Sequence, residues 1–163
     1  MRPLRFLALV AVVAAGCQQA QAPDPRVAAL ADRLAIDQLV AGDYPRALDA
    51  HNWDAYVATF TDDGELVLGE NHTKGHDAMK GFLGGLPAEP RVIHVISNLS
   101  YEIKGDAATG GAYWQDIGVG DVHGVLAAGH YVDALRKVNG TWKFTKREIV
   151  VQAGEAPPPA AAK

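Results

Sequence analysis

The sequence predicts an α+β fold, in which N-terminal helices pack on a curved antiparallel sheet and form a cone-shaped barrel. Apolar residues recur at helical spacing early in the chain, at Val27, Leu30 and Leu34. The later part changes to four long runs of strand-like composition, at residues 91–104, 107–118, 124–138 and 141–152. Helices followed by strands are typical of domains whose helices cover one face of a sheet.

The helical part is expected to weaken at Gly42 and to kink or restart at Pro45. Proline has no backbone N–H to donate and its ring clashes with the preceding turn. Shorter helical pieces are then predicted at residues 45–51, 53–60 and 77–83.

Turn signals separate the predicted strands. Asp62-Asp63-Gly64 predicts a turn before a short strand at residues 65–69. Gly105-Asp106 and Asn139-Gly140 separate long runs, and Asn-Gly is a strong signal for a two-residue hairpin. A sheet that curves over helices encloses an apolar pocket between the two layers.

The first 17 residues have the features of a bacterial export signal. Arg2 and Arg5 form a positive start, and the uncharged stretch at residues 6–15 is too short to span a bilayer as a mature helix. The segment VAAGC at residues 13–17 resembles a lipobox. Cys17, the only cysteine of the chain, is therefore the expected lipid-attachment residue.

An ordinary secreted form is the alternative. Ala20-Gln21-Ala22 fits the pattern of a standard signal-peptidase site, although Pro23 directly after it disfavours cleavage there. Either reading places the protein outside the cytoplasm, and the first anchors it to a membrane in the cell envelope.

The chain is organised as a signal (1–17), a tether (18–24), one domain (25–153) and an Ala/Pro-rich tail (154–163). Loss of Arg2 and Arg5 with the signal changes the net charge from −4 to −6. No cluster of Lys or Arg remains, which argues against a nucleic-acid partner. A single cysteine excludes an internal disulfide, so the core is held by packing.

Six short motifs recur in an order and spacing that resemble a known group of proteins. They are LAIDQL (34–39), ALD (47–49) followed by WD (53–54), FTDDG (60–64), HVISN (94–98), GHYVD (129–133) and GTWKF (140–144). The domain is thereby similar to the nuclear transport factor two-like superfamily and its SnoaL-like group. The resemblance implies a cone-shaped α+β barrel with a deep pocket and dimerisation through the outer sheet face. The superfamily also includes proteins that are not enzymes.

Within that group, the motifs look closest to scytalone dehydratases and hexachlorocyclohexane dehydrochlorinases. The resemblance implies that Asp49 and His94 form the Asp–His base of an elimination. The residues agree with this role: apolar neighbours surround Asp49, and His94 shares a strand face with Ile96 and Asn98. A neutral His held in one tautomer by a carboxylate can remove a proton.

Four further residues are expected to shape the pocket, namely Tyr44, Asn98, Trp114 and Tyr131. Trp114 departs from the scytalone dehydratase pattern, because it falls where that enzyme has a second pocket histidine. A second proton-handling group is therefore missing from the prediction. The dehydrochlorinase pattern needs only one dyad and a cation, for which Arg46 and Arg147 are the nearest choices.

The pattern predicts neither a metal site nor a cofactor. His72 and His76 are four residues apart, but Thr73 and Gly75 indicate a loop. Two functions stay open: a cofactor-free lyase or isomerase acting on a small apolar or hydroxylated molecule, and a non-catalytic ligand-binding or accessory lipoprotein.

Overall fold

The structure is a computed structural model that describes residues 24–86 and 91–154. The predicted signal with Cys17, the tether up to residue 23, and the tail from residue 155 lie outside the described residues. No helix within the described ranges is long and apolar enough to cross a membrane.

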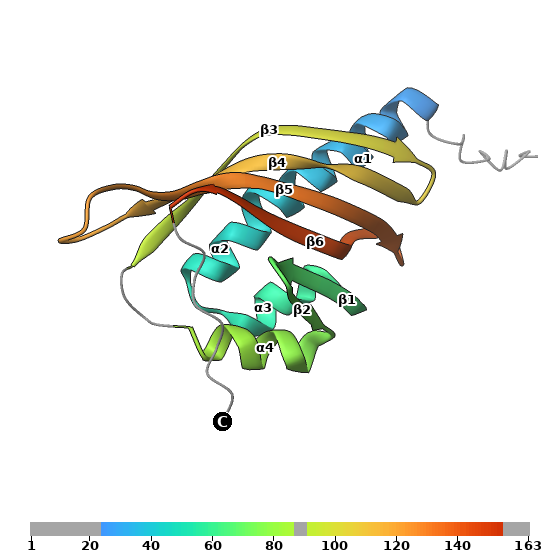
Figure 1. Cartoon of the computed structure of the whole chain (residues 1–163). Helices are drawn as coiled ribbons and strands as arrows, with labels where there is room; N and C mark the ends of the chain where they lie inside the picture. Colours follow the sequence, from blue (N-terminus) through green and yellow to red (C-terminus); the bar gives the residue numbers. More distant parts are fainter. Residues whose placement is uncertain (1–23, 87–90, 155–163) are drawn as a thin grey trace, which may run out of the picture.

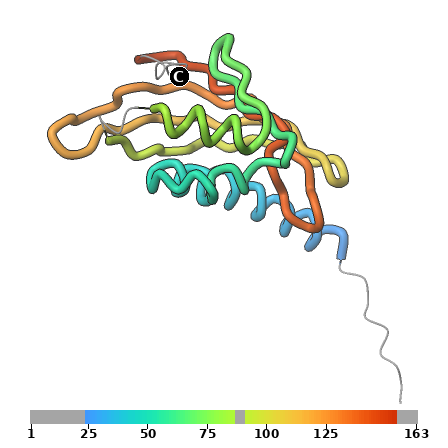
Figure 2. Tube along the Cα trace, turned by 90° about the horizontal axis from the view of Figure 1, so that it is seen from below, coloured from blue at the N-terminus to red at the C-terminus, as the bar shows by residue number. Residues whose placement is uncertain are grey.

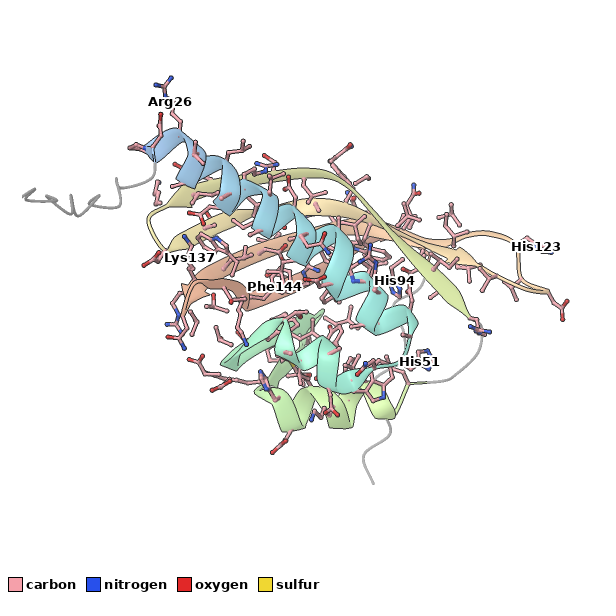
Figure 3. All side chains as sticks on the ribbon, turned by 180° about the vertical axis from the view of Figure 1, so that it is seen from behind. Arg26, His51, His94, His123, Lys137 and Phe144 are labelled. Atoms are coloured by element: carbon pink, nitrogen blue, oxygen red, sulfur yellow. The ribbon has the colours of Figure 1, made fainter. Side chains whose placement is uncertain are left out.

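The N-terminal helical run is continuous through the predicted break. Helix α1 (Pro25–Gln38) starts at Asp24, whose carboxylate accepts a hydrogen bond from the Arg26 N–H at 2.8 Å. One wide π-turn, η1 (Leu39–Asp43), then leads into α2 (Tyr44–Asp49). Because Tyr44 N–H donates to Leu39 across this turn, the missing N–H of Pro45 is accommodated without ending the helix. Figure 3 shows α1 and α2 as one run in front of the sheet.

Two short helices and two strands follow. Helix α3 (Trp53–Ala58) is capped by the Asn52 side chain, and α4 (His76–Gly84) follows the strands β1 (Phe60–Leu68) and β2 (Asn71–Lys74). The predicted turn at 62–64 is wrong, because these residues lie within β1. Its pairing with the last strand shifts register between Phe60 and Glu65, so the turn-like residues mark an irregularity in a strand.

The four long strands form the predicted meander. They are β3 (Val92–Lys104), β4 (Ala107–Gly118), β5 (Gly124–Val138) and β6 (Thr141–Ala153). Asn139 and Gly140 both have positive φ, 50° and 81°, as a tight hairpin requires.

The sheet has six strands in the order β2-β1-β6-β5-β4-β3 and does not close on itself. The β1–β6 pair is parallel, which makes the sheet mixed and not purely antiparallel. The predicted α+β class, with helices on one face of a curved sheet, is confirmed (Figure 1). Figure 2 shows α1 and α2 running along one face of the long strands.

A one-residue bulge in β3 decides which side chains face the helices. Ser97 pairs with Tyr113 and Ser100 with Gly111, so two residues of β3 oppose a single residue of β4. Asn98 lies in this bulge with a φ of 52°. Alternation therefore shifts by one: His94 faces the helices before the bulge, and Tyr101 faces them after it.

The core fills the space between the helices and the sheet. Tyr44 lies at its centre, with its ring against those of Tyr56, Phe60, Tyr131 and Phe144 at centroid distances of 4.9–6.3 Å. Trp142 and Phe144 are buried in this core, whereas Trp53 is only partly buried. This packing fixes the position of α2 over β3 and thereby the position of Asp49.

Candidate functional site

Asp49 and His94 meet where the end of α2 lies against β3. Asp49 is the last residue of α2, and its Oδ1 is 2.6 Å from His94 Nδ1. The backbone N–H of His94 also points at this carboxylate, 3.2 Å from Oδ1 and 3.4 Å from Oδ2. The structure thus brings together the two residues that the sequence predicts as a dyad (His94 is labelled in Figure 3).

The contact assigns one tautomer to the neutral imidazole. A carboxylate can only accept, so Nδ1 carries the proton and the lone pair lies on Nε2. The side chains keep some exposure, 14% for His94 and 26% for Asp49. Nε2 is therefore a basic atom whose ring is held in place on its opposite side.

A second carboxylate faces the other ring nitrogen. Asp116 pairs directly with His94 across the β3–β4 ladder, and its Oδ1 lies 3.3 Å from His94 Nε2. Burial raises the pKa of the Asp116 carboxyl; the nearby His94 opposes this shift, and the charge of Asp49 adds to it. The result is a row of three titratable groups, Asp49, His94 and Asp116.

Sequence reasoning missed Asp116 because of the bulge. A regular ladder counted back from the 105–106 turn would place Ile117 opposite His94, and the bulge moves Asp116 to that place. Trp114 lies opposite Ile96, two pairs further along on the same face of the sheet. The residue on β4 opposite His94 is therefore an acid, and Trp114, which the resemblance placed at the position of a second pocket histidine, lies beside it on the same strand.

Trp114 and Tyr131 are neighbours beside this row. Both are buried, and their rings are stacked with centroids 6.1 Å apart and an interplanar angle of 27°. Gly129 pairs with Trp114, and its missing side chain leaves room for the indole. The Trp114 Nε1–H has no hydrogen-bond partner within the described part of the chain.

Arg147, one of the two candidate cations, forms a buried ion pair with Asp133. Arg147 is 0% exposed, and it donates to Asp133 from Nε at 2.9 Å and from Nη2 at 2.7 Å. The guanidinium carbon lies 3.9–4.1 Å from the ring centroids of Tyr44, Tyr131 and Phe144. Arg147 is thus the centre of a packed polar core, whereas Arg46 is exposed.

Tyrosine hydroxyls complete this polar core. Tyr101 reaches over Gly110 and donates to Asp133 Oδ2 at 2.5 Å, and Tyr56 donates to the Tyr44 hydroxyl at 3.1 Å. Burial raises the pKa of Tyr44 and Tyr131, so both phenols stay protonated at neutral pH. Both are neutral groups that can donate a hydrogen bond.

Asn98 does not join the site. Its side chain is exposed at the bulge, so the predicted alternation with His94 on one strand face is wrong. His72 lies on β2 and contacts Glu65 at 2.9 Å, and His76 starts α4. The described residues contain no group of three His, Cys, Asp or Glu side chains placed to hold a metal ion.

The profile of the SnoaL-like domain matches residues 28–148, which is most of the chain. This chain belongs to the SnoaL-like family. A search of curated proteins gave no match. The domain boundaries of the SnoaL-like match contain Asp49, His94, Asp116 and the Asp133–Arg147 pair.

Solved structures of similar fold extend this result. A protein of unknown function from Mycobacterium tuberculosis is 23% identical, with a TM-score of 0.74 over 80% of this chain and 78% of that one. A protein of unknown function with a cystatin-like fold from Nostoc punctiforme is 27% identical, with a TM-score of 0.69 over 75% and 92%. A candidate scytalone dehydratase from Novosphingobium aromaticivorans is 23% identical, with a TM-score of 0.66 over 85% and 99%. At these identities the structures establish the fold alone.

Proposed function

We propose that this SnoaL-like domain is a cofactor-free lyase or isomerase that removes a proton from a small, mostly apolar molecule. The observation that carries the proposal is the 2.6 Å contact between Asp49 and His94 Nδ1, which leaves Nε2 as the base. The name of the Novosphingobium neighbour, a candidate scytalone dehydratase, is in line with an elimination.

Asp49 has two roles in this proposal. It fixes the tautomer and the orientation of the ring, and its negative charge stabilises the imidazolium that forms when Nε2 takes the proton. Trp114 and Tyr131 supply apolar surface, and the Tyr131 hydroxyl is a neutral donor. The apolar pocket that encloses the substrate remains part of the proposal.

Solvent exchange and elimination can be measured together with a simple ketone. β-Hydroxybutyrophenone has an acidic C–H next to its carbonyl and a hydroxyl that can leave as water. In deuterated water the protein is expected to accelerate either deuterium uptake at that carbon or formation of the enone, both followed by proton NMR. Chlorinated and hydroxylated analogues extend the same assay, with thermal stabilisation as a check for binding. Ligands that raise the melting temperature without any proton exchange would support the non-catalytic binding function instead.

We also propose that the domain is exported and attached to a membrane through Cys17, as the lipobox-like segment suggests. A Cys17→Ser variant is expected to leave the membrane fraction of expressing cells. Retention of that variant in the membrane fraction would contradict lipid attachment.

We also propose that two copies of the domain pair through the outer face of the sheet. Exposed apolar residues on that face, such as Tyr113 and Val132, support this pairing, which the molar mass in solution would test.

A further inference from the structure

Asp116 contacts the imidazole at the atom that the proposed reaction uses. Its Oδ1 lies 3.3 Å from His94 Nε2, and this oxygen is buried without a hydrogen-bond partner in the described residues. The Asp116 side chain as a whole is 19% exposed. The exposed part of the side chain therefore does not include Oδ1, the oxygen that lies next to the ring.

The protons at this contact can be counted. Nδ1 carries one proton for Asp49, so the lone pair lies on Nε2, which is 3.3 Å from Asp116 Oδ1 but not aligned with it as in a hydrogen bond. If Asp116 is ionised, the lone pairs of Nε2 and Oδ1 lie close together with no proton between them, which is repulsive in a buried setting. One added proton, on either Oδ1 or Nε2, turns the contact into an attraction. Besides His94, the titratable groups that interact with Asp116 are Asp49 and the protonated phenol of Tyr131.

We propose that Asp116 is a second proton-handling group, which shares one proton with His94 Nε2 and delivers it to a departing hydroxyl of the substrate. This inference rests on the proposed function for its chemical step and adds the acid that the sequence lacked at Trp114. The register that places Asp116 opposite His94 and the 3.3 Å contact support it.

The step balances without any co-reactant. Neutral His94 takes the carbon-bound proton, and the C–H electron pair becomes the new double bond. The C–O bond breaks with its pair on oxygen, and the proton from Asp116 makes the leaving group water. A small rotation of the side chains aligns the 3.3 Å contact, and the proton on Nε2 then passes to Asp116, which restores the starting state.

The acid narrows the substrate class. A halide leaves without a proton, whereas a hydroxyl leaves poorly unless it is protonated. A paired acid and base therefore favours a molecule with a hydroxyl two carbons from a carbonyl over a halogenated one.

The shared proton can be observed by NMR of the labelled full-length protein. In the wild type, the ¹³Cγ signal of Asp116 and the ¹⁵Nε2 signal of His94 are expected to change together, at a pH above that where an exposed Asp titrates. In Asp116→Asn the ¹⁵Nε2 change at that pH is expected to disappear. Asp121→Asn, which removes an exposed carboxylate from the β4–β5 turn, is the matched control and should leave both signals as in the wild type.

The outcomes separate the two proposals. If Asp49→Asn alters the imidazole signals but Asp116→Asn does not, the base stands and the Asp116 inference is overturned. If neither variant alters them, the dyad and with it the proposed function fail. In the enone assay, Asp116→Asn is expected to slow loss of water from β-hydroxybutyrophenone at least about tenfold more than loss of chloride from β-chlorobutyrophenone. Equal slowing of both would overturn the acid role.

Discussion

Replacing Asp133 with alanine is expected to lower the free energy of unfolding by about 3–5 kcal/mol, because it leaves the Arg147 charge buried and unpaired. Arg147 is 0% exposed, and it forms an ion pair with Asp133 through two hydrogen bonds. Three aromatic rings surround the guanidinium, so water cannot easily replace the carboxylate. Tyr101 also loses the acceptor of its hydroxyl. Urea unfolding followed by circular dichroism measures the loss.

Two controls isolate the cause. Asp63→Ala removes an exposed partner of Arg136 and is expected to change stability little. The double variant Asp133→Leu with Arg147→Met removes both charges at once, so it should be more stable than Asp133→Ala alone. A single Asp133→Ala variant as stable as Asp63→Ala would show that the buried pair does not require its carboxylate.

Replacing His94 with glutamine is expected to reduce the rate of proton exchange or elimination about 10²–10⁴-fold. Glutamine keeps polar character at the position but cannot act as a base near neutral pH. Asp49→Asn is expected to cause a loss in the same range, because the neutral amide cannot stabilise the imidazolium, and its NH₂ group can donate to Nδ1 and so favour the other tautomer. Initial rates with β-hydroxybutyrophenone measure both variants.

The chain contains its own control for these variants. His72 contacts Glu65 at 2.9 Å, which is also a histidine–carboxylate pair, but its side chain is 58% exposed and lies on β2. His72→Gln should therefore react at the wild-type rate. A His94→Gln variant that is folded by circular dichroism and keeps the wild-type rate would contradict the proposed base.

Local signals in the sequence were sufficient for most of the fold. The Asn139-Gly140 turn and the long apolar runs predict the meander, since both depend on neighbouring residues. Strand β2 was not predicted, because it is only four residues long and its residues, NHTK, are all polar. The parallel β1–β6 pair could not be predicted either, because it joins segments about 80 residues apart with no turn between them to fix the register.

Residues of the candidate site were predicted only where their neighbours in the sequence or the family resemblance indicated them. Asp49 and His94 were found in this way, and the structure brings them together. Arg147 was named only as a candidate cation, and its buried pairing with Asp133 was not predicted, because charged residues in strands usually face solvent. Asp116 required knowledge of the strand register, which a single bulge changes.

The bulge in β3 has a consequence for recognising distant relatives. His94 and Tyr101 are separated by an odd number of positions, so a regular strand would place them on opposite faces of the sheet. The extra residue at Asn98 is what turns both toward the helices. A relative with an even separation could present the same two side chains on an unbulged strand. Motif searches for this site should therefore let the distance between these two residues vary by one, and treat that difference as compensated geometry instead of a lost site.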